Sequence, residues 1–358
     1  MRLRVALGAA CGIAACIFIF ARHDWNDVWQ AATLIGWGFA GLVLWRFASL
    51  LVAGTAWRML FARGSRPGFS IAIVARWVSE SVNGLLPVAQ VGGELARARL
   101  AFHALKRQGK AASGMDAAAT VIVDMTLALV AQVLFSLLGL WQLWRLNDHA
   151  TARLATGIVV SVLPLLLLVV AQHQGAIRGG TALAARFGLT RLVADESQDH
   201  PLWARLAALY GRLSISVPVS AAHVLAWTCR AGETWLALRM MGHPIGVLDA
   251  VMIEGLLSAA RTIGFLLPAG LGVQEGALLL LCGWVGVPGH MALALALLKR
   301  ARELAVGMPG LAVWAVLERP RSRRHHRMGK DMPVTRGLDP RVSTLRHEMP
   351  GSSPGMTD

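Results

Sequence analysis

Two short segments of this chain place a glutamate just after a helix-breaking cluster within apolar sequence. They read Asn83-Gly-Leu-Leu-Pro-Val-Ala-Gln-Val-Gly-Gly-Glu94 and Gly264-Phe-Leu-Leu-Pro-Ala-Gly-Leu-Gly-Val-Gln-Glu275, with the glutamate seven residues after the proline in both. Charges and freed backbone groups are costly in lipid unless protein or a water-filled cavity surrounds them. Two such breaks at corresponding places predict a transport site between two inverted repeats.

The polar residues around these breaks are the candidate substrate-binding residues. A guanidinium matches the oxygens of phosphate and other anionic headgroups, which favours Arg76, Arg97 and Arg261. Glu94 and Glu275 stand near the starts of the second half-helices, where each either caps the helix and pairs with an arginine or contacts a headgroup or a proton. The full candidate set is Arg76, Glu80, Asn83, Gln90, Glu94, Arg97, Asp124, Arg261, Gln274 and Glu275.

Further charged residues interrupt the apolar segments and require partners, because an isolated charge in lipid is costly. Asp124 stands in the middle of an apolar segment and is expected to face the interior and to pair there. Arg230 and Glu233 are three residues apart, which favours an ion pair on one helix face. Arg97 has an alternative interpretation, in which it lies at the cytoplasmic surface.

Composition defines the class of protein. Of the 358 residues, 55% are hydrophobic and only 15% are charged, with a mean hydropathy of +0.54. Soluble domains carry about 25% charged residues, so we predict an all-α polytopic membrane protein. The net charge of +15 lies in loops and the C-terminal tail, which indicates topology control and anionic lipid rather than nucleic acid. Motifs for nucleotide, zinc or a catalytic nucleophile are absent, so we expect no catalytic residue, metal or cofactor.

Apolar windows predict about six full transmembrane helices and two helix–break–helix segments, 70–103 around Pro87 and 248–287 around Pro268. Basic loops place both termini in the cytoplasm if both segments are re-entrant hairpins. The alternative is that each segment forms two short spans. The predicted full spans are 4–21, 31–54, 117–144, 154–172, 215–241 and 290–317, with an amphipathic stretch at 202–213.

The two prolines are 181 residues apart, and this offset aligns 31–54 with 215–241 and 117–144 with 290–317. We therefore predict a transmembrane domain over 1–317, with half-repeats at about 1–144 and 154–317. An odd number of full crossings in the first half would invert the second. Residues 318–358 are basic and rich in Pro, Gly and Ser, which predicts a disordered cytoplasmic tail.

The motifs at 83–99 and 268–276 resemble the lysylphosphatidylglycerol synthase transmembrane (flippase-like) family, and most closely its hopanoid-biosynthesis-associated HpnL-type members. The resemblance covers roughly residues 1–317. It implies a bacterial inner-membrane protein that moves hopanoids or a related aminoacyl or anionic phospholipid, with hopanoid-biosynthesis or lipid-export proteins as partners. The soluble domain that makes aminoacyl lipids in bifunctional members has no counterpart here, so lysyl transfer is not expected.

Three functions remain open from the sequence. The leading hypothesis is a lipid translocase. The second is a lipid-modifying transferase, such as a phosphatidylglycerol lysyltransferase, which would need a nucleophile or a base beside a donor site. The third is a membrane scaffold for hopanoid biosynthesis, which would not need two buried glutamates.

Overall fold

The computed structural model describes residues 14, 17–19, 21–86, 92–110, 113–146, 202–263 and 272–318. Every regular element within these ranges is helical, in agreement with the predicted class. Several predicted features lie outside the described residues, namely most of the span 4–21, the span 154–172, Pro87, Gln90, Pro268 and the tail after Glu318.

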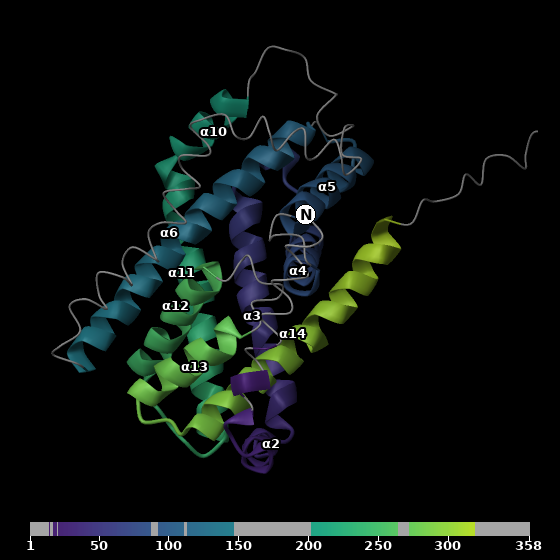
Figure 1. The fold of residues 1–358 in the computed structure, drawn as a ribbon. Coiled ribbons are helices and arrows are strands. Elements are labelled where there is room, and N and C mark those ends of the chain that lie inside the picture. The colour runs from purple at the N-terminus through teal and green to yellow at the C-terminus, as the bar shows by residue number, and fades with distance from the viewer. Residues whose placement is uncertain are drawn as a thin grey trace, which may run out of the picture. The chain divides into compact units, whose positions relative to one another are not determined.

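The helices form two series with a similar order of lengths (Figure 1). Each series has a short helix, a long helix, two helices of intermediate or short length and a second long helix. The first series is α2 (Trp25–Thr33), α3 (Gly38–Met59), the single 3-10 turn η1 (Arg63–Ser65), α4 (Phe69–Leu85), α5 (Gly92–Arg107) and α6 (Gly114–Leu146). The second is α10 (Leu202–Tyr210), α11 (Leu213–Met240), α12 (Val247–Ile263), α13 (Val273–Trp284) and α14 (Gly289–Glu318).

The predicted span 31–54 is wrong at its start. Residues 31–33 end α2, which begins after Asp24, whose carboxylate accepts a hydrogen bond from the backbone of Asn26 at 2.8 Å. Gly36 adopts a φ of +47°, a conformation that favours glycine, and breaks the chain before α3 begins. The apolar pattern crosses this turn without interruption, so hydropathy alone does not detect it.

Two helices, α3 and α6, are long and apolar enough to cross a membrane by length and composition. The helices α11 and α14 have 28 and 30 residues. At about 1.5 Å per residue they also exceed the roughly 30 Å of a hydrocarbon core. Both carry buried charged residues in their length, including Glu233 in α11 and Lys299 in α14.

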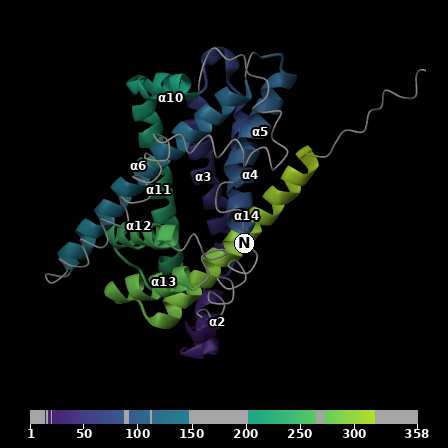
Figure 2. The ribbon, with the colours of Figure 1, turned by 45° about the horizontal axis from the view of Figure 1, so that its top comes forward.

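Packing joins the two series through their long helices (Figures 1 and 2). α3 lies against α11, and α6 runs along α11 and α12. Small residues allow α6 and α12 to approach closely. At this contact the Ser136 hydroxyl donates to the carbonyl of Gly255 at 2.9 Å. On the other side, the Trp77 indole of α4 donates to the carbonyl of Val306 in α14 at 2.8 Å. Helices from one series therefore support the broken segment of the other.

Candidate functional site

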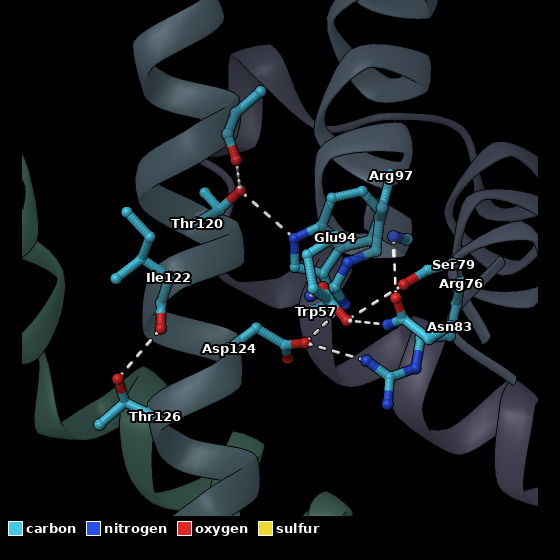
Figure 3. A network of polar contacts seen from close by, with 12 residues as sticks. Trp57, Arg76, Ser79, Asn83, Glu94, Arg97, Thr120, Ile122, Asp124 and Thr126 are labelled. Carbon is cyan, nitrogen blue, oxygen red and sulfur yellow. Dashed lines mark hydrogen bonds and ion pairs between the residues drawn. The ribbon is translucent and has the colours of Figure 1, made fainter. Parts of the chain in front are cut away.

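One buried cluster of polar residues lies where α4 and α5 pack together, and Figure 3 shows most of its side chains pointing toward one another. Its side chains come from four helices, α4, α5, α6 and α11. We call it the first network. Its members are Arg76, Ser79 and Asn83 from α4, Glu94 and Arg97 from α5, Asp124 from α6 and His223 from α11.

Arg97 is the centre of the first network and is fully buried. One of its guanidinium nitrogens donates to Asp124 at 2.6 Å, and the other donates to Glu94 at 2.5 Å. Its guanidinium also stacks on the Trp57 ring, 4.7 Å from the ring centroid. The alternative that placed Arg97 at the cytoplasmic surface is wrong, because its side chain is fully buried among α4, α5 and α6.

Asp124 has the partners that its position in an apolar segment requires. One carboxylate oxygen accepts from Arg97 and lies 3.4 Å from a guanidinium nitrogen of Arg76. The other oxygen lies 2.9 Å from Nε2 of His223. Asp124 thus connects three helices besides its own, and the prediction that it faces the interior and pairs there is confirmed.

The start of α5 is held by side chains of α4. Asn83 accepts from the backbone N–H of Gly93 at 2.8 Å, while Glu94 accepts from the Ser79 hydroxyl at 3.1 Å and from the Asn83 amide at 3.5 Å. A Cβ at Gly93 would lie 2.1 Å from the carbonyl oxygen of Ser79. The break therefore positions Glu94 only because residue 93 has no side chain.

A second cluster of mostly charged residues includes the end of α12 and the start of α13, and we call it the second network. It joins α12, α13 and α14 to α11, α3 and α4. Its members are Arg46, Glu80, Arg230, Glu233, Thr234, Glu254, Arg261, Gln274, Glu275, Lys299, Arg300, Arg302 and Glu303.

Glu275 caps α13 in the second network. One of its carboxylate oxygens accepts from the backbone N–H of Gly272 at 2.8 Å, and the other accepts from Nε of Arg300 at 3.1 Å. Gly272 has a φ of +80°, which glycine adopts without strain. Glu94 and Glu275 are both the third residue of a helix that follows a break, and both pair with an arginine.

Glu303 of α14 links Arg261 of α12 to the ion pair of Glu275 and Arg300. It accepts from Arg261 at 2.5 Å and from Arg300 at 3.3 Å. The candidate Arg261 therefore lies within the same ion-pair network as the candidate Glu275, linked through Arg300. At the second break, Glu275 is paired by a residue of α14, whereas at the first break Glu94 is paired by Arg97 of its own helix, α5.

The middle of α11 does not pair as predicted. Glu233 lies 2.7 Å from Nε of Arg302 in α14, whereas the Arg230 guanidinium stacks on the ring of Trp227 at 4.6 Å. The predicted Arg230–Glu233 pair is therefore wrong. Glu233 is paired instead with a residue of another helix, α14. Nearby, Lys299 donates at 2.8 Å to Glu254.

Two further candidates differ in whether their polar groups have partners. Glu80 forms an ion pair with Arg46 of α3. The side chain of Gln274 is fully buried, and neither its amide nitrogen nor its amide oxygen has a hydrogen-bond partner among the described residues. A buried amide without partners is costly. Gln274 is thus a candidate for contact with a bound molecule, while Gln90 lies outside the described residues.

The family of the lysylphosphatidylglycerol synthase TM region matches residues 3–310. The chain belongs to this family. No curated protein and no solved structure matches it. Membership in the lysylphosphatidylglycerol synthase TM family identifies a membrane protein with a lipid-related function, in agreement with the apolar helices α3 and α6.

The two networks offer this family member a means of recognising charge. In the ranges that the structure describes, no group of His, Cys, Asp and Glu side chains is arranged to hold a metal ion. Asp124, Glu254 and Glu275 each accept from a cationic side chain. Carboxylates engaged in this way fix the positions of the cations around them, and the cations present N–H donors to an anion.

The sequence-based candidate set omitted charged residues that the structure places in the same clusters. Arg46, Glu254 and Lys299 are all buried in the second network, and His223 completes the first. The sequence indicated these residues, because a charge within an apolar helix must be buried among protein groups. What the sequence did not carry was the identity of the partners, which come from other helices.

Proposed function

We propose that the protein is a lipid translocase of the bacterial inner membrane that moves hopanoids or a related aminoacyl or anionic phospholipid. The observation that carries the proposal is the pair of buried charge networks, each built around a glutamate at the start of a half-helix. Charged side chains at membrane depth are expensive and mark pathways for polar groups. Family membership supports a lipid as the molecule that carries those groups.

We further propose that the two series of helices are inverted repeats. Glu94 and Glu275 occupy the same position in α5 and α13, and the order of helix lengths recurs. The proposed topology has six full spans and two re-entrant hairpins, with both termini in the cytoplasm. A lipid headgroup would then pass between the repeats at the level of the breaks, as in transporters with discontinuous helices.

The central test is headgroup movement by charge-neutral variants. Glu94→Gln and Glu275→Gln remove one carboxylate from each network while keeping a side-chain acceptor, so lipid movement should fall by at least about tenfold if the charge guides the headgroup. Purified protein is reconstituted into vesicles with fluorescent hopanoid or phosphatidylglycerol analogues. Exposure of the label in the outer leaflet is measured, and folding is followed by detergent chromatography.

Asp116→Asn is the matched control for this test. Asp116 is likewise the third residue of a helix, α6, and accepts from the backbone of Ser113 at 3.1 Å, but it lies outside both networks. Loss of a capping charge alone therefore affects all three variants alike. Wild-type lipid movement by Glu94→Gln and Glu275→Gln would reduce these glutamates to structural caps and remove the translocase site.

The proposed topology has its own test. Reporter fusions at Gly242, in the turn between α11 and α12, and after Glu318 should report opposite sides of the membrane. The reason is that α14 would be a full span and the α12–α13 segment a re-entrant hairpin. Equal signals from the two fusions would contradict the inverted-repeat proposal.

A further inference from the structure

The second network contains more cations than carboxylates. Six cationic side chains face five glutamates among the described residues, which leaves one positive charge in excess. A net buried charge is costly in a medium of low dielectric constant. The cations are Arg46, Arg230, Arg261, Lys299, Arg300 and Arg302, and the carboxylates are Glu80, Glu233, Glu254, Glu275 and Glu303.

Arg230 holds the excess charge. No carboxylate oxygen of the described residues lies within ion-pairing distance of its half-buried guanidinium, which instead stacks on Trp227. Stacking on an aromatic face leaves the N–H donors at the guanidinium edge available. Glu254 and Glu233 attract this charge from beyond ion-pairing distance, while Arg261 and Arg302 repel it, so an anion in direct contact with Arg230 would be stabilising.

Arg46 adds buried N–H donors to the second network. One of its terminal nitrogens pairs with Glu80, but Nε and the other terminal nitrogen are buried without a hydrogen-bond partner in the described part of the chain. Arg230 and Arg302 repel its charge as well. Unbonded N–H groups on a buried cation are costly, so an acceptor at this place would be stabilising.

Arg76 extends the cationic group toward the first network. It forms an ion pair with Asp124 at 3.4 Å, and the same aspartate is bound more closely by Arg97 at 2.6 Å. Arg230 is close enough to repel Arg76. The three arginines lie on α3, α4 and α11, and α3 packs against both of the other helices. Their sequence neighbours are in contact, because the Trp45 indole donates to the carbonyl of Cys229 at 2.7 Å and the Phe47 ring packs on Trp77.

We propose that Arg46, Arg76 and Arg230 form a binding site for a phosphate oxyanion, with the phosphate of a phospholipid headgroup as its occupant. A phosphate carries the negative charge that the second network lacks, and its oxygens accept from several guanidinium groups at once. A neutral polyol headgroup would leave the excess charge in place. The inference rests on the proposed function and narrows its cargo to a phospholipid.

The test is direct binding to the purified protein in neutral detergent. Phosphatidylglycerol and diacylglycerol of the same acyl chains are titrated, and binding is followed by the thermal unfolding midpoint and by native mass spectrometry. We expect phosphatidylglycerol to raise the midpoint and diacylglycerol to have little effect. Arg230→Gln should bind phosphatidylglycerol at least about tenfold more weakly, because one charge-assisted contact is lost.

Arg239→Gln is the matched control, since Arg239 lies on the same helix and stacks on Trp235 at 5.3 Å, but is exposed at the helix end. It should bind like the wild type. Equal binding of phosphatidylglycerol by the Arg230 and Arg239 variants would overturn the site, and so would equal binding of the two lipids. If Arg230→Gln does not elute as a folded protein, Arg46→Lys replaces it, and unchanged binding by that variant has the same consequence.

Inorganic phosphate separates the two sources of the oxyanion. Displacement of phosphatidylglycerol by phosphate shows that the site holds the phosphate group itself, and phosphate binding without lipid binding assigns the site to the free ion. The binding assay requires no transport. If the wild-type protein binds phosphatidylglycerol but moves no lipid, the proposed translocase function is wrong and the proposed phosphate site stands. A lipid-moving protein whose Arg230 variant binds normally would do the reverse.

Discussion

The first and second networks occupy equivalent breaks but balance their charges differently. In the first, two arginines face two carboxylates, and the histidine His223 completes the coordination of Asp124. In the second, Lys299 and five arginines face five glutamates, and Arg230 is left with an aromatic ring instead of a carboxylate. The first network is therefore closed in net charge, whereas the second has capacity for an additional anion.

The difference also separates two kinds of cation. Arg97, at the centre of the first network, stays charged in any protein environment, so it depends on its carboxylates. Lys299, in the second, donates to the Thr234 hydroxyl as well as to Glu254, so it keeps one acceptor if that carboxylate is removed. The comparison predicts a rigid first network that fails when one member is lost and a second network that tolerates change.

Asp124→Asn should therefore have the largest effect on stability. It leaves the buried Arg97 with Glu94 as its remaining carboxylate and weakens the contact with His223. We expect the free energy of unfolding in detergent to fall by about 3–5 kcal/mol, as for other broken buried ion pairs. Asp116→Asn, on the exposed side of α6, should change it by less than about 1 kcal/mol. Similar unfolding midpoints for the two variants would contradict a closed first network.

Glu254→Gln tests the second network at the equivalent level. Its expected cost is smaller, about 2–3 kcal/mol, because Lys299 loses an ion pair but keeps the Thr234 hydroxyl at 2.8 Å. Adding Lys299→Met should recover most of the loss, since an apolar side chain replaces an unpaired cation. A double variant no more stable than Glu254→Gln would show that the lysine is not the cause.

Gly93→Ala and Gly276→Ala compare how tightly the starts of α5 and α13 are packed. In Gly93→Ala, the added Cβ would lie 2.1 Å from the Ser79 carbonyl and must move α5 away from α4, at a cost of about 1–3 kcal/mol. Gly276→Ala, near the start of α13, meets only Ile19 at 3.7 Å and should be close to neutral. Thermal unfolding of both variants measures the difference. Comparable midpoints would mean that the first break is not tightly packed.

Sequence patterns predicted the helices and the two breaks because hydrophobic periodicity and helix-breaking residues are local properties. The predicted segment 117–144 lies within α6, and 215–241 lies on α11 within one or two residues. The start of 31–54 was wrong because Gly36 turns the chain inside an apolar run. The inverted repeat and the number of spans stay predictions.

The pairing of charges was predicted less well, because it depends on which helices cross. The local spacing rule joined Arg230 to Glu233, but Arg302 arrives from α14 and binds Glu233 instead. The burial of Arg97 had the same origin, since its partner Asp124 lies on α6. Sequence can show that a buried charge needs a partner, whereas the packing of distant segments decides which partner it receives.

The smallest expected effect comes from single hydroxyl groups and asks whether charge strengthens the first network beyond ordinary packing. Ser79 donates to the carboxylate of Glu94 at 3.1 Å, and Ser136 donates to the neutral carbonyl of Gly255 at 2.9 Å. Both serines are buried and both bonds join two helices.

Serine hydroxyl bonds in membrane proteins contribute about 0.6 kcal/mol on average, and an ionised acceptor roughly doubles the strength of a hydrogen bond. Ser136→Ala should therefore lower the free energy of unfolding by about 0.6 kcal/mol, and Ser79→Ala by about 1 kcal/mol or slightly more. Repeating both measurements in the Glu94→Gln background removes the charge at one site only, so the Ser79 effect should shrink to the size of the Ser136 effect. If it does not shrink, the hydroxyl of Ser79 acts through packing against α5, and the first network is less electrostatic than its geometry indicates.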